Sequence, residues 1–76
     1  MITVRLYGLL RLDSGIKERQ MEAGSVKEVF TQLIRLVLSK QALEGCVILV
    51  NGKPGNKRQK LNDGDVVQML SPVAGG

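Results

Sequence analysis

The sequence has no histidine and no tryptophan, and only one cysteine, one tyrosine and one phenylalanine among its 76 residues. A single cysteine cannot form a disulfide within the chain, and a Cys/His zinc site needs more ligands than are present. We therefore expect no metal site and a fold held together by aliphatic packing. The net charge of +4, from eleven Lys and Arg against seven Asp and Glu, permits an anionic partner without identifying one.

Long apolar runs are also absent. No stretch approaches the roughly 20 residues that a membrane-spanning helix needs. Since Met1 leads directly into patterned sequence, we expect no secretory signal peptide. We expect a cytoplasmic protein with no membrane partner. A chain of this length forms one domain with a single modest core.

Hydrophobic periodicity predicts the first elements. Residues 2–7 alternate apolar and polar side chains as a half-buried strand does, and a weaker, charged strand over about 16–22 is expected at a sheet edge. Gly8 is expected to break the first strand, and residues 13–15 (Asp-Ser-Gly) indicate a turn. Ser25 and Glu28 form a capping box that predicts a helix over about 26–38. Its expected apolar stripe consists of Val26, Val29, Phe30, Leu33, Ile34 and Val37.

Two further apolar segments complete the predicted sheet. Residues 46–50 are apolar on both faces and end at a turn, Asn51-Gly52, while residues 66–70 follow an Asp-Gly-Asp turn. The element order favours an α+β fold, a β-grasp roll in which one main helix packs across one face of a mixed sheet. The first and last strands would lie side by side and parallel. Residues 1–70 would form this domain, and residues 71–76 a flexible tail.

Three segments resemble one known family. The stretches "VRLYGLLRL" (4–12), "VILVNGK" (47–53) and "LNDGDVVQMLSPVAGG" (61–76) resemble the ubiquitin-like sulfur carriers of the MoaD/ThiS type. The resemblance covers essentially the whole chain, and within the family it points to the small subunit of molybdopterin synthase. It departs from the family pattern at Ser71-Pro72, where many members have two prolines.

The resemblance implies a function for the tail. An ATP-dependent, E1-like adenylating enzyme would activate the C-terminal carboxylate of Gly76, and sulfur would then replace AMP to leave a thiocarboxylate. The sulfur would pass to a pterin precursor held by the large subunit of molybdopterin synthase, in molybdenum cofactor biosynthesis. By this resemblance the chain itself binds no cofactor and is non-catalytic alone.

The tail also has the small side chains that insertion into another protein requires. It consists of Ser71, Pro72, Val73, Ala74, Gly75 and Gly76. The two glycines lack Cβ atoms, and Pro72 fixes its own φ and favours extended backbone before it. Six extended residues reach about 20 Å. We expect the tail to be mobile in the isolated protein and extended inside a partner.

A docking surface is expected beside the tail. If Ile48, Val50, Val67 and Met69 point toward the helix, strand alternation places Val47, Leu49, Val66 and Leu70 on the opposite face of the sheet. We interpret these four residues as a surface for partner proteins. The alternative is that loops bury both faces.

Other interpretations stay open. A sister carrier for thiamine thiazole or tRNA thiolation, or a ubiquitin-like protein modifier, would share the fold and the tail. A β-grasp module that binds RNA or protein is the alternative of another class. The basic residues of 53–60 have no aromatic residues among them, which favours a solvated loop over a nucleic-acid site. Without histidine to activate it, Cys46 is expected to be a small buried hydrophobe, and Asp63 and Asp65 to be turn residues.

Overall fold

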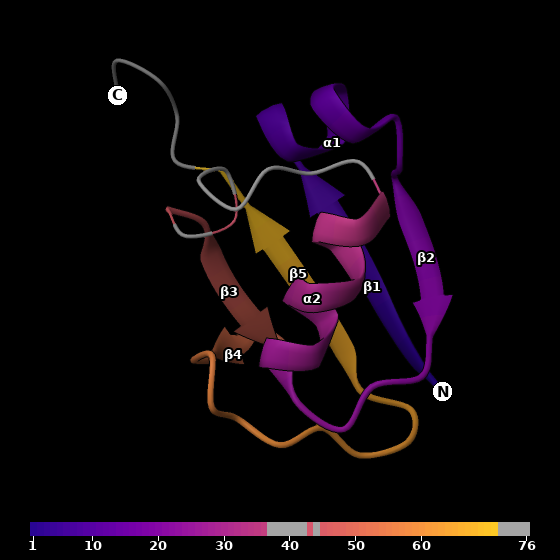
Figure 1. Ribbon diagram of the computed structural model, residues 1–76. Coiled ribbons are helices and arrows are strands. Elements are labelled where there is room, and N and C mark those ends of the chain that lie inside the picture. The colour runs from indigo at the N-terminus through magenta and orange to yellow at the C-terminus, as the bar shows by residue number, and fades with distance from the viewer. Residues whose placement is uncertain (37–42, 44, 72–76) are drawn as a thin grey trace.

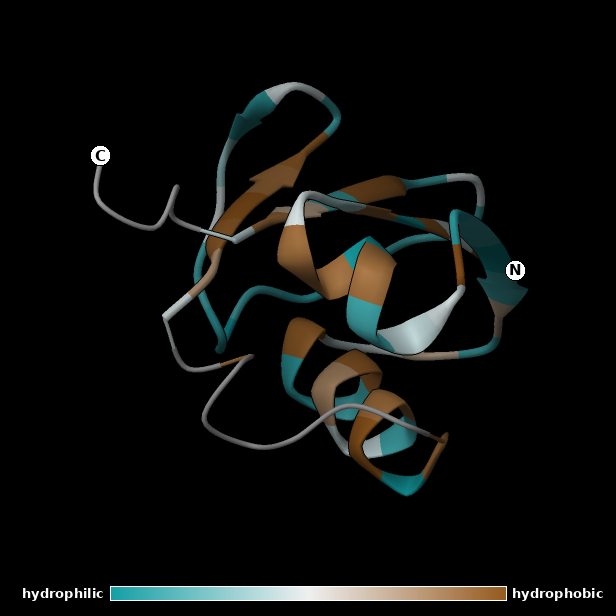
Figure 2. Cartoon of the chain, turned by 90° about the horizontal axis from the view of Figure 1, so that it is seen from above, coloured by the Kyte–Doolittle hydropathy of each residue, from teal (hydrophilic) through white to brown (hydrophobic). Residues whose placement is uncertain are grey.

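The computed structural model describes residues 1–36, 43 and 45–71. Its elements are β1 (Ile2–Tyr7), α1 (Leu9–Ser14), β2 (Glu18–Met21), α2 (Val26–Leu36), β3 (Val47–Val50), β4 (Lys53–Pro54) and β5 (Val66–Leu70). They form two layers, with the sheet on one side and α2 lying across one of its faces (Figures 1 and 2). Within these described residues, no helix is both long enough and apolar enough to cross a membrane.

The five-stranded sheet is mixed, and its strand order is β2-β1-β5-β3-β4. β1 and β5 lie side by side and parallel in the middle, whereas the β1–β2, β3–β5 and β3–β4 pairs are antiparallel. The predicted pairing of the first and last strands is therefore confirmed. The predicted edge position of the charged second strand is confirmed as well, although β2 is shorter than the expected 16–22.

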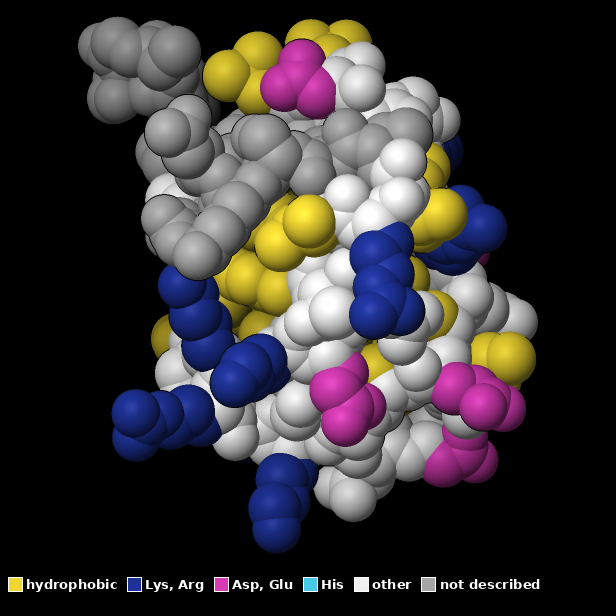
Figure 3. Space-filling view, in the orientation of Figure 1, with side chains coloured by type: hydrophobic (Ala, Val, Ile, Leu, Met, Phe, Trp, Pro, Cys, Tyr) yellow, Lys and Arg dark blue, Asp and Glu magenta, His cyan; other side chains and the backbone are white. Residues whose placement is uncertain are grey.

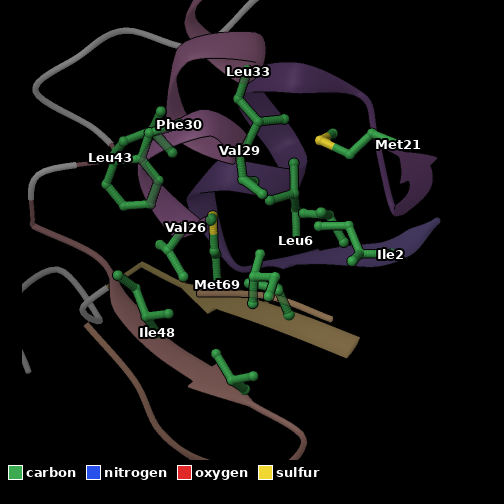
Figure 4. Packing of buried hydrophobic residues seen from close by; sticks show 14 of the residues in the cluster. Ile2, Leu6, Met21, Val26, Val29, Phe30, Leu33, Leu43, Ile48 and Met69 are labelled. Carbon is green, nitrogen blue, oxygen red and sulfur yellow. The ribbon is translucent and has the colours of Figure 1, made fainter. Parts of the chain in front are cut away.

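The core lies between α2 and the sheet, and apart from Phe30 its members are aliphatic residues and methionines (Figure 4). From the helix, Val26, Val29, Phe30 and Leu33 are buried, and they meet Val4, Leu6, Ile48, Val50, Val67 and Met69 from the central strands. Ile34 was expected in this stripe but is 42% exposed, so that prediction is wrong. At 3.6 residues per turn, Ile34 lies about 80° around the helix from Val26, at the margin of the stripe. Val37 and the predicted helix end at 38 lie outside the described residues.

Helix α1 was not predicted from the sequence pattern. It begins after Gly8 and ends at Gly15, which has a φ of 72° and donates its N–H to the Arg11 carbonyl oxygen at 2.9 Å. Helices commonly end at a glycine in this left-handed conformation. The Asp-Ser-Gly sequence, interpreted as an isolated turn, is thus the end of a short helix that is anchored to the core by the buried Leu10.

The capping box predicted at the start of α2 forms with one change: the Glu28 side chain reaches back to Gly24, one residue before Ser25. The Ser25 hydroxyl oxygen accepts a hydrogen bond from the Glu28 N–H at 3.3 Å, and the Glu28 carboxylate accepts one from the Gly24 N–H at 2.5 Å. We predict that Ser25→Ala lowers the free energy of unfolding by about 1 kcal/mol, because one helix N–H loses its acceptor. Urea unfolding would measure the change, and Ser25→Asp, which keeps an acceptor, is the control. Equal stability of Ser25→Ala and the wild type would contradict the prediction.

The turn before β5 is organised by Asp65. Its carboxylate accepts hydrogen bonds from the Asn62 N–H at 2.8 Å and from the Asn51 side-chain amide at 2.9 Å. These two bonds hold the pKa of Asp65 below its ordinary value. The expected turn role of this residue is confirmed.

The lowered pKa of Asp65 predicts a dependence of stability on pH. A carboxylate whose pKa is lower in the folded than in the unfolded state stabilises the fold above the unfolded pKa, and this stabilisation is lost as pH falls through the folded pKa. We expect Asp65→Asn to be less stable than the wild type at neutral pH, and the difference to shrink below about pH 4. Thermal unfolding across this range would measure it. Melting curves that keep a constant separation at every pH would contradict the assignment.

Candidate functional site

The face of the sheet opposite α2, here called the outer face, carries the four apolar residues predicted for docking. Val47 is 52% exposed, and Leu49, Val66 and Leu70 are partly exposed. Their neighbours along β3 and β5 are buried against the helix, so the predicted alternation is confirmed. The function of these residues in docking stays a prediction.

Strand pairing joins part of this face into one apolar row. Val47 pairs with Leu70, and Leu70 pairs with Tyr7, so one row of apolar side chains crosses β3, β5 and β1. We call Tyr7, Val47, Leu49, Val66 and Leu70 the outer patch. Gln68 lies between its members and donates a hydrogen bond to the Tyr7 hydroxyl at 3.1 Å. This bond leaves the tyrosine ring as apolar surface with its polar end satisfied.

Tyr7 was not predicted as part of this surface. The alternation of residues 2–7 does place it on the outer face, but its position beside Leu70 follows only from the register of the parallel β1–β5 pair. A sequence with one tyrosine offers a weak signal by composition. The register therefore supplies the neighbour of Tyr7 across the strands, which the alternation alone could not give.

The outer patch leads directly to the tail. Leu70 is both a patch residue and the last residue of β5, and Ser71 follows it. The predicted tail residues Pro72, Val73, Ala74, Gly75 and Gly76 lie outside the described residues. What the structure establishes is that the chain leaves the sheet at the end of the outer patch where Val47, Leu70 and Tyr7 pair.

A hollow of about 400 Å³ lies next to this end of the sheet, between β1, α1 and β2. It is lined by Arg5, Leu6, Tyr7, Arg11, Lys17 and Glu18. The Arg5 side chain donates to the Glu18 carboxylate at 2.7 Å, so one of the three cations is paired there. The sequence pattern does not predict this hollow, because its residues come from separate parts of the chain.

Cys46 is only partly buried, whereas a buried hydrophobe was expected. Burial raises the pKa of its thiol, an effect that the nearby Lys57 partly opposes. A thiol with a raised pKa provides little thiolate at neutral pH. This environment fits a packing residue and not a sulfur-transferring nucleophile.

The basic residues of 53–60 lie on the β4 side of the molecule. Lys53, Lys57, Arg58 and Lys60 are all exposed, and Lys and Arg side chains gather there in the space-filling view (Figure 3). The Lys57 ammonium lies 5.7 Å from the centre of the Phe30 ring, a cation–π geometry. Phe30 belongs to the core, and residues 53–60 contain no aromatic residue, so no aromatic side chain is offered here to a nucleic-acid base.

The fold and the exit of the tail define a class of protein. A mixed sheet with parallel first and last strands, crossed by one helix, is the β-grasp arrangement of ubiquitin-like proteins, and here its last strand leads into a diglycine segment. The model of the ThiS family matches residues 4–76, and the chain belongs to this family. The resemblance found in the sequence is thereby confirmed. No curated protein matches the sequence significantly.

Solved structures support the same class. A chain of the complex of subunits 1 and 2 of molybdopterin-converting factor from Helicobacter pylori 26695 is 30% identical, with a TM-score of 0.75; the match covers 99% of this chain and 97% of that one. SAMP1 from Haloferax volcanii has a TM-score of 0.85 at 17% identity, with 99% and 98% covered. A chain of the BexX/CysO complex of Amycolatopsis orientalis has a TM-score of 0.76 at 22% identity, and the match covers 100% of this chain and 100% of that one. The chain thus has the fold of the ThiS/MoaD-type ubiquitin-like sulfur carriers.

Proposed function

We propose that this protein carries sulfur as a thiocarboxylate on Gly76 and donates it as the small subunit of molybdopterin synthase. The observation that carries the proposal is the 30% identity, over 99% of this chain, to a chain of the Helicobacter pylori complex of molybdopterin-converting factor subunits 1 and 2. The membership of the ThiS family over residues 4–76, which includes the diglycine, supports the carrier function itself.

The chemistry places few demands on the side chains of the carrier. A free carboxylate is a poor acyl donor, so the activating partner first joins the Gly76 carboxylate to AMP from ATP and releases pyrophosphate. Hydrosulfide, or a donor at the same oxidation level, then attacks the acyl carbon, AMP departs as the leaving group, and –C(=O)S⁻ remains. The main chain of Gly76 is the reacting group, which fits a chain without histidine and with a thiol whose pKa is raised by burial.

The outer patch gives the carrier a way to be recognised by its partners. A carrier loaded by one enzyme and emptied by another must bind both through a surface near its tail. The outer patch is apolar and partly exposed, and its residue Leu70 directly precedes Ser71. Its tyrosine and aliphatic side chains can serve as anchors in an interface. We propose that an E1-like adenylating enzyme and the large synthase subunit use it in turn. Since the cycle consumes ATP, we place it in the cytoplasm.

The carrier function can be tested by intact mass spectrometry. The purified protein would be incubated with an adenylating enzyme of the family, ATP and a sulfur donor. We expect a mass increase equal to the difference between one sulfur and one oxygen atom, and none for a variant that lacks Gly75 and Gly76. If the full chain shows no such species beside a family carrier that does, the carrier proposal is wrong.

The pathway is tested separately, with the thiocarboxylated protein in hand. Mixed with a large subunit of molybdopterin synthase and the cyclic pyranopterin precursor, it should lose its sulfur in step with the formation of the dithiolene product. Retention of sulfur there, with transfer to a thiazole or tRNA acceptor system, would assign the protein to a sister pathway while leaving the carrier function intact.

A further inference from the structure

The start of the tail is attached to α1 through a side chain. The Ser71 hydroxyl oxygen accepts a hydrogen bond from the Leu9 N–H at 2.7 Å. Leu9 is the first residue of α1, and N–H groups in the first turn of a helix have no acceptor within the helix. Ser71 therefore supplies an acceptor that the helix itself does not provide.

Gly8 provides the space in which this bond forms. It has a φ of 62°, a conformation that side chains disfavour, and a Cβ built on it would overlap the Ser71 Oγ. The Ser71 Cβ lies 3.8 Å from the same point, so the hydroxyl alone occupies the space that a Gly8 side chain would fill. Close backbone approach at Gly8 and the hydroxyl of Ser71 are thus two parts of one contact.

The contact lies just beyond the strand ladder. The last residue pair between β1 and β5 is Tyr7 with Leu70, and each strand ends there. One residue further along each strand, Gly8 meets Ser71, and Leu9 donates to it. The attachment of the chain to the domain is therefore extended past the outer patch, to the residue from which the tail begins.

We propose that Ser71 is a positioning residue, whose hydroxyl, seated in the space left by Gly8, holds the start of the tail against α1 and so sets the direction in which the tail enters a partner. The inference rests on the proposed carrier function. A chain fixed at its base loses less conformational entropy when the rest of it is ordered in an active site. Docking through the outer patch does not involve the hydrogen bond between Leu9 and Ser71. Loss of this bond should therefore impair productive insertion of the tail and leave the strength of docking unchanged.

The first test compares Ser71→Ala with Ser71→Thr, which keeps the hydroxyl. In the adenylation assay, with the carrier as varied substrate, we expect Ser71→Ala to lower kcat about threefold to tenfold, the ordinary effect of one hydrogen bond, with KM unchanged. Ser71→Thr should stay close to the wild type. Unchanged kcat in Ser71→Ala, or an equal loss in both variants, would overturn the proposal.

The second test uses NMR on the isolated protein and does not depend on sulfur chemistry. In Ser71→Ala, the Leu9 amide should exchange with solvent faster and the backbone order parameter of residue 71 should fall, while both keep wild-type values in Ser71→Thr. If the wild type accepts no sulfur but these changes appear, the function proposal fails and the attachment stands. If neither NMR observable changes, the attachment itself is wrong.

A double-mutant cycle tests the part of Gly8. Gly8→Ala should displace the Ser71 hydroxyl and speed Leu9 exchange as Ser71→Ala does. In the Ser71→Ala background the overlapping atom is gone and the nearest remaining side-chain atom is 3.8 Å away, so Gly8→Ala should speed Leu9 exchange by less than it does in the wild type; what remains is the strain of a side chain at a φ of 62°. Fully additive effects would show that Gly8 and Ser71 act independently, contrary to the proposal.

Discussion

A protein extended by one residue beyond Gly76 will not accept sulfur, although it will fold as the wild type does. The added residue moves the terminal carboxylate about 3.5 Å past the position at which, in the proposed cycle, the activating enzyme would join it to AMP. Reaction at a fixed site is lost with displacements of this size, since reacting atoms must lie within about 3.5 Å of one another. We expect thiocarboxylate formation to fall below detection by intact mass spectrometry, with the melting temperature unchanged.

Substitution of Gly75 provides a graded control for this prediction. Gly75→Ala adds one methyl group and should keep part of the activity, whereas Gly75→Val adds a branched side chain and should block it. Neither change touches the core described by the structure, so stability should be unaffected. An extended protein that accepts sulfur without first being trimmed would show that Gly76 is not the reactive end.

We expect Leu70→Glu in the outer patch to weaken binding to both proposed partners, the adenylating enzyme and the synthase subunit. In the free protein this side chain is partly exposed, so a glutamate remains hydrated and the fold survives. In either complex the carboxylate would be buried without a partner, which costs at least about 2 kcal/mol, or roughly 30-fold in affinity. Isothermal titration calorimetry with each partner would measure the loss, and circular dichroism would verify the fold.

The matched control is Ile34→Glu on α2. Ile34 is also an exposed aliphatic residue, 42% exposed, but it lies on the helix at the other side of the sheet. The same change of charge there should leave both affinities near the wild-type values. Leu70→Arg should weaken both complexes as Leu70→Glu does, because either charge would be buried. Unfolding of the Leu70 variants would place this residue in the core, and an equal loss for Ile34→Glu would remove the outer patch from the interface.

The fold could be predicted because its main signals are local and agree with one another. Alternation in residues 2–7, the capping box at Ser25 and the two turns each specify an element without knowledge of the others. One apolar helix stripe then needs a sheet to cover it, and the two apolar strands need neighbours. The burial of Val26, Val29 and Leu33 against Val67 and Met69 is the outcome of that pattern.

What the sequence could not predict depends on contacts between distant residues. α1 is too short for a periodic signal, and it begins beside a contact between Gly8 and Ser71, which lie far apart in the sequence. The place of Tyr7 in the outer patch depends on the register of two strands separated by most of the chain. Ile34 was misplaced because a helical stripe has no sharp margin.

The parallel pairing of β1 with β5 also makes completion of the sheet depend on the last strand of the chain. β5 fills the gap between β1 and β3, so without it the sheet is split into two pieces whose inner edges and apolar faces are bare. Such non-local pairing forms late, after the closing strand has been synthesised. A chain interrupted before Val66 would therefore expose the unpaired edges of β1 and β3 to solvent. The outer patch is therefore complete only in a molecule that also contains β5, the strand from which the tail begins.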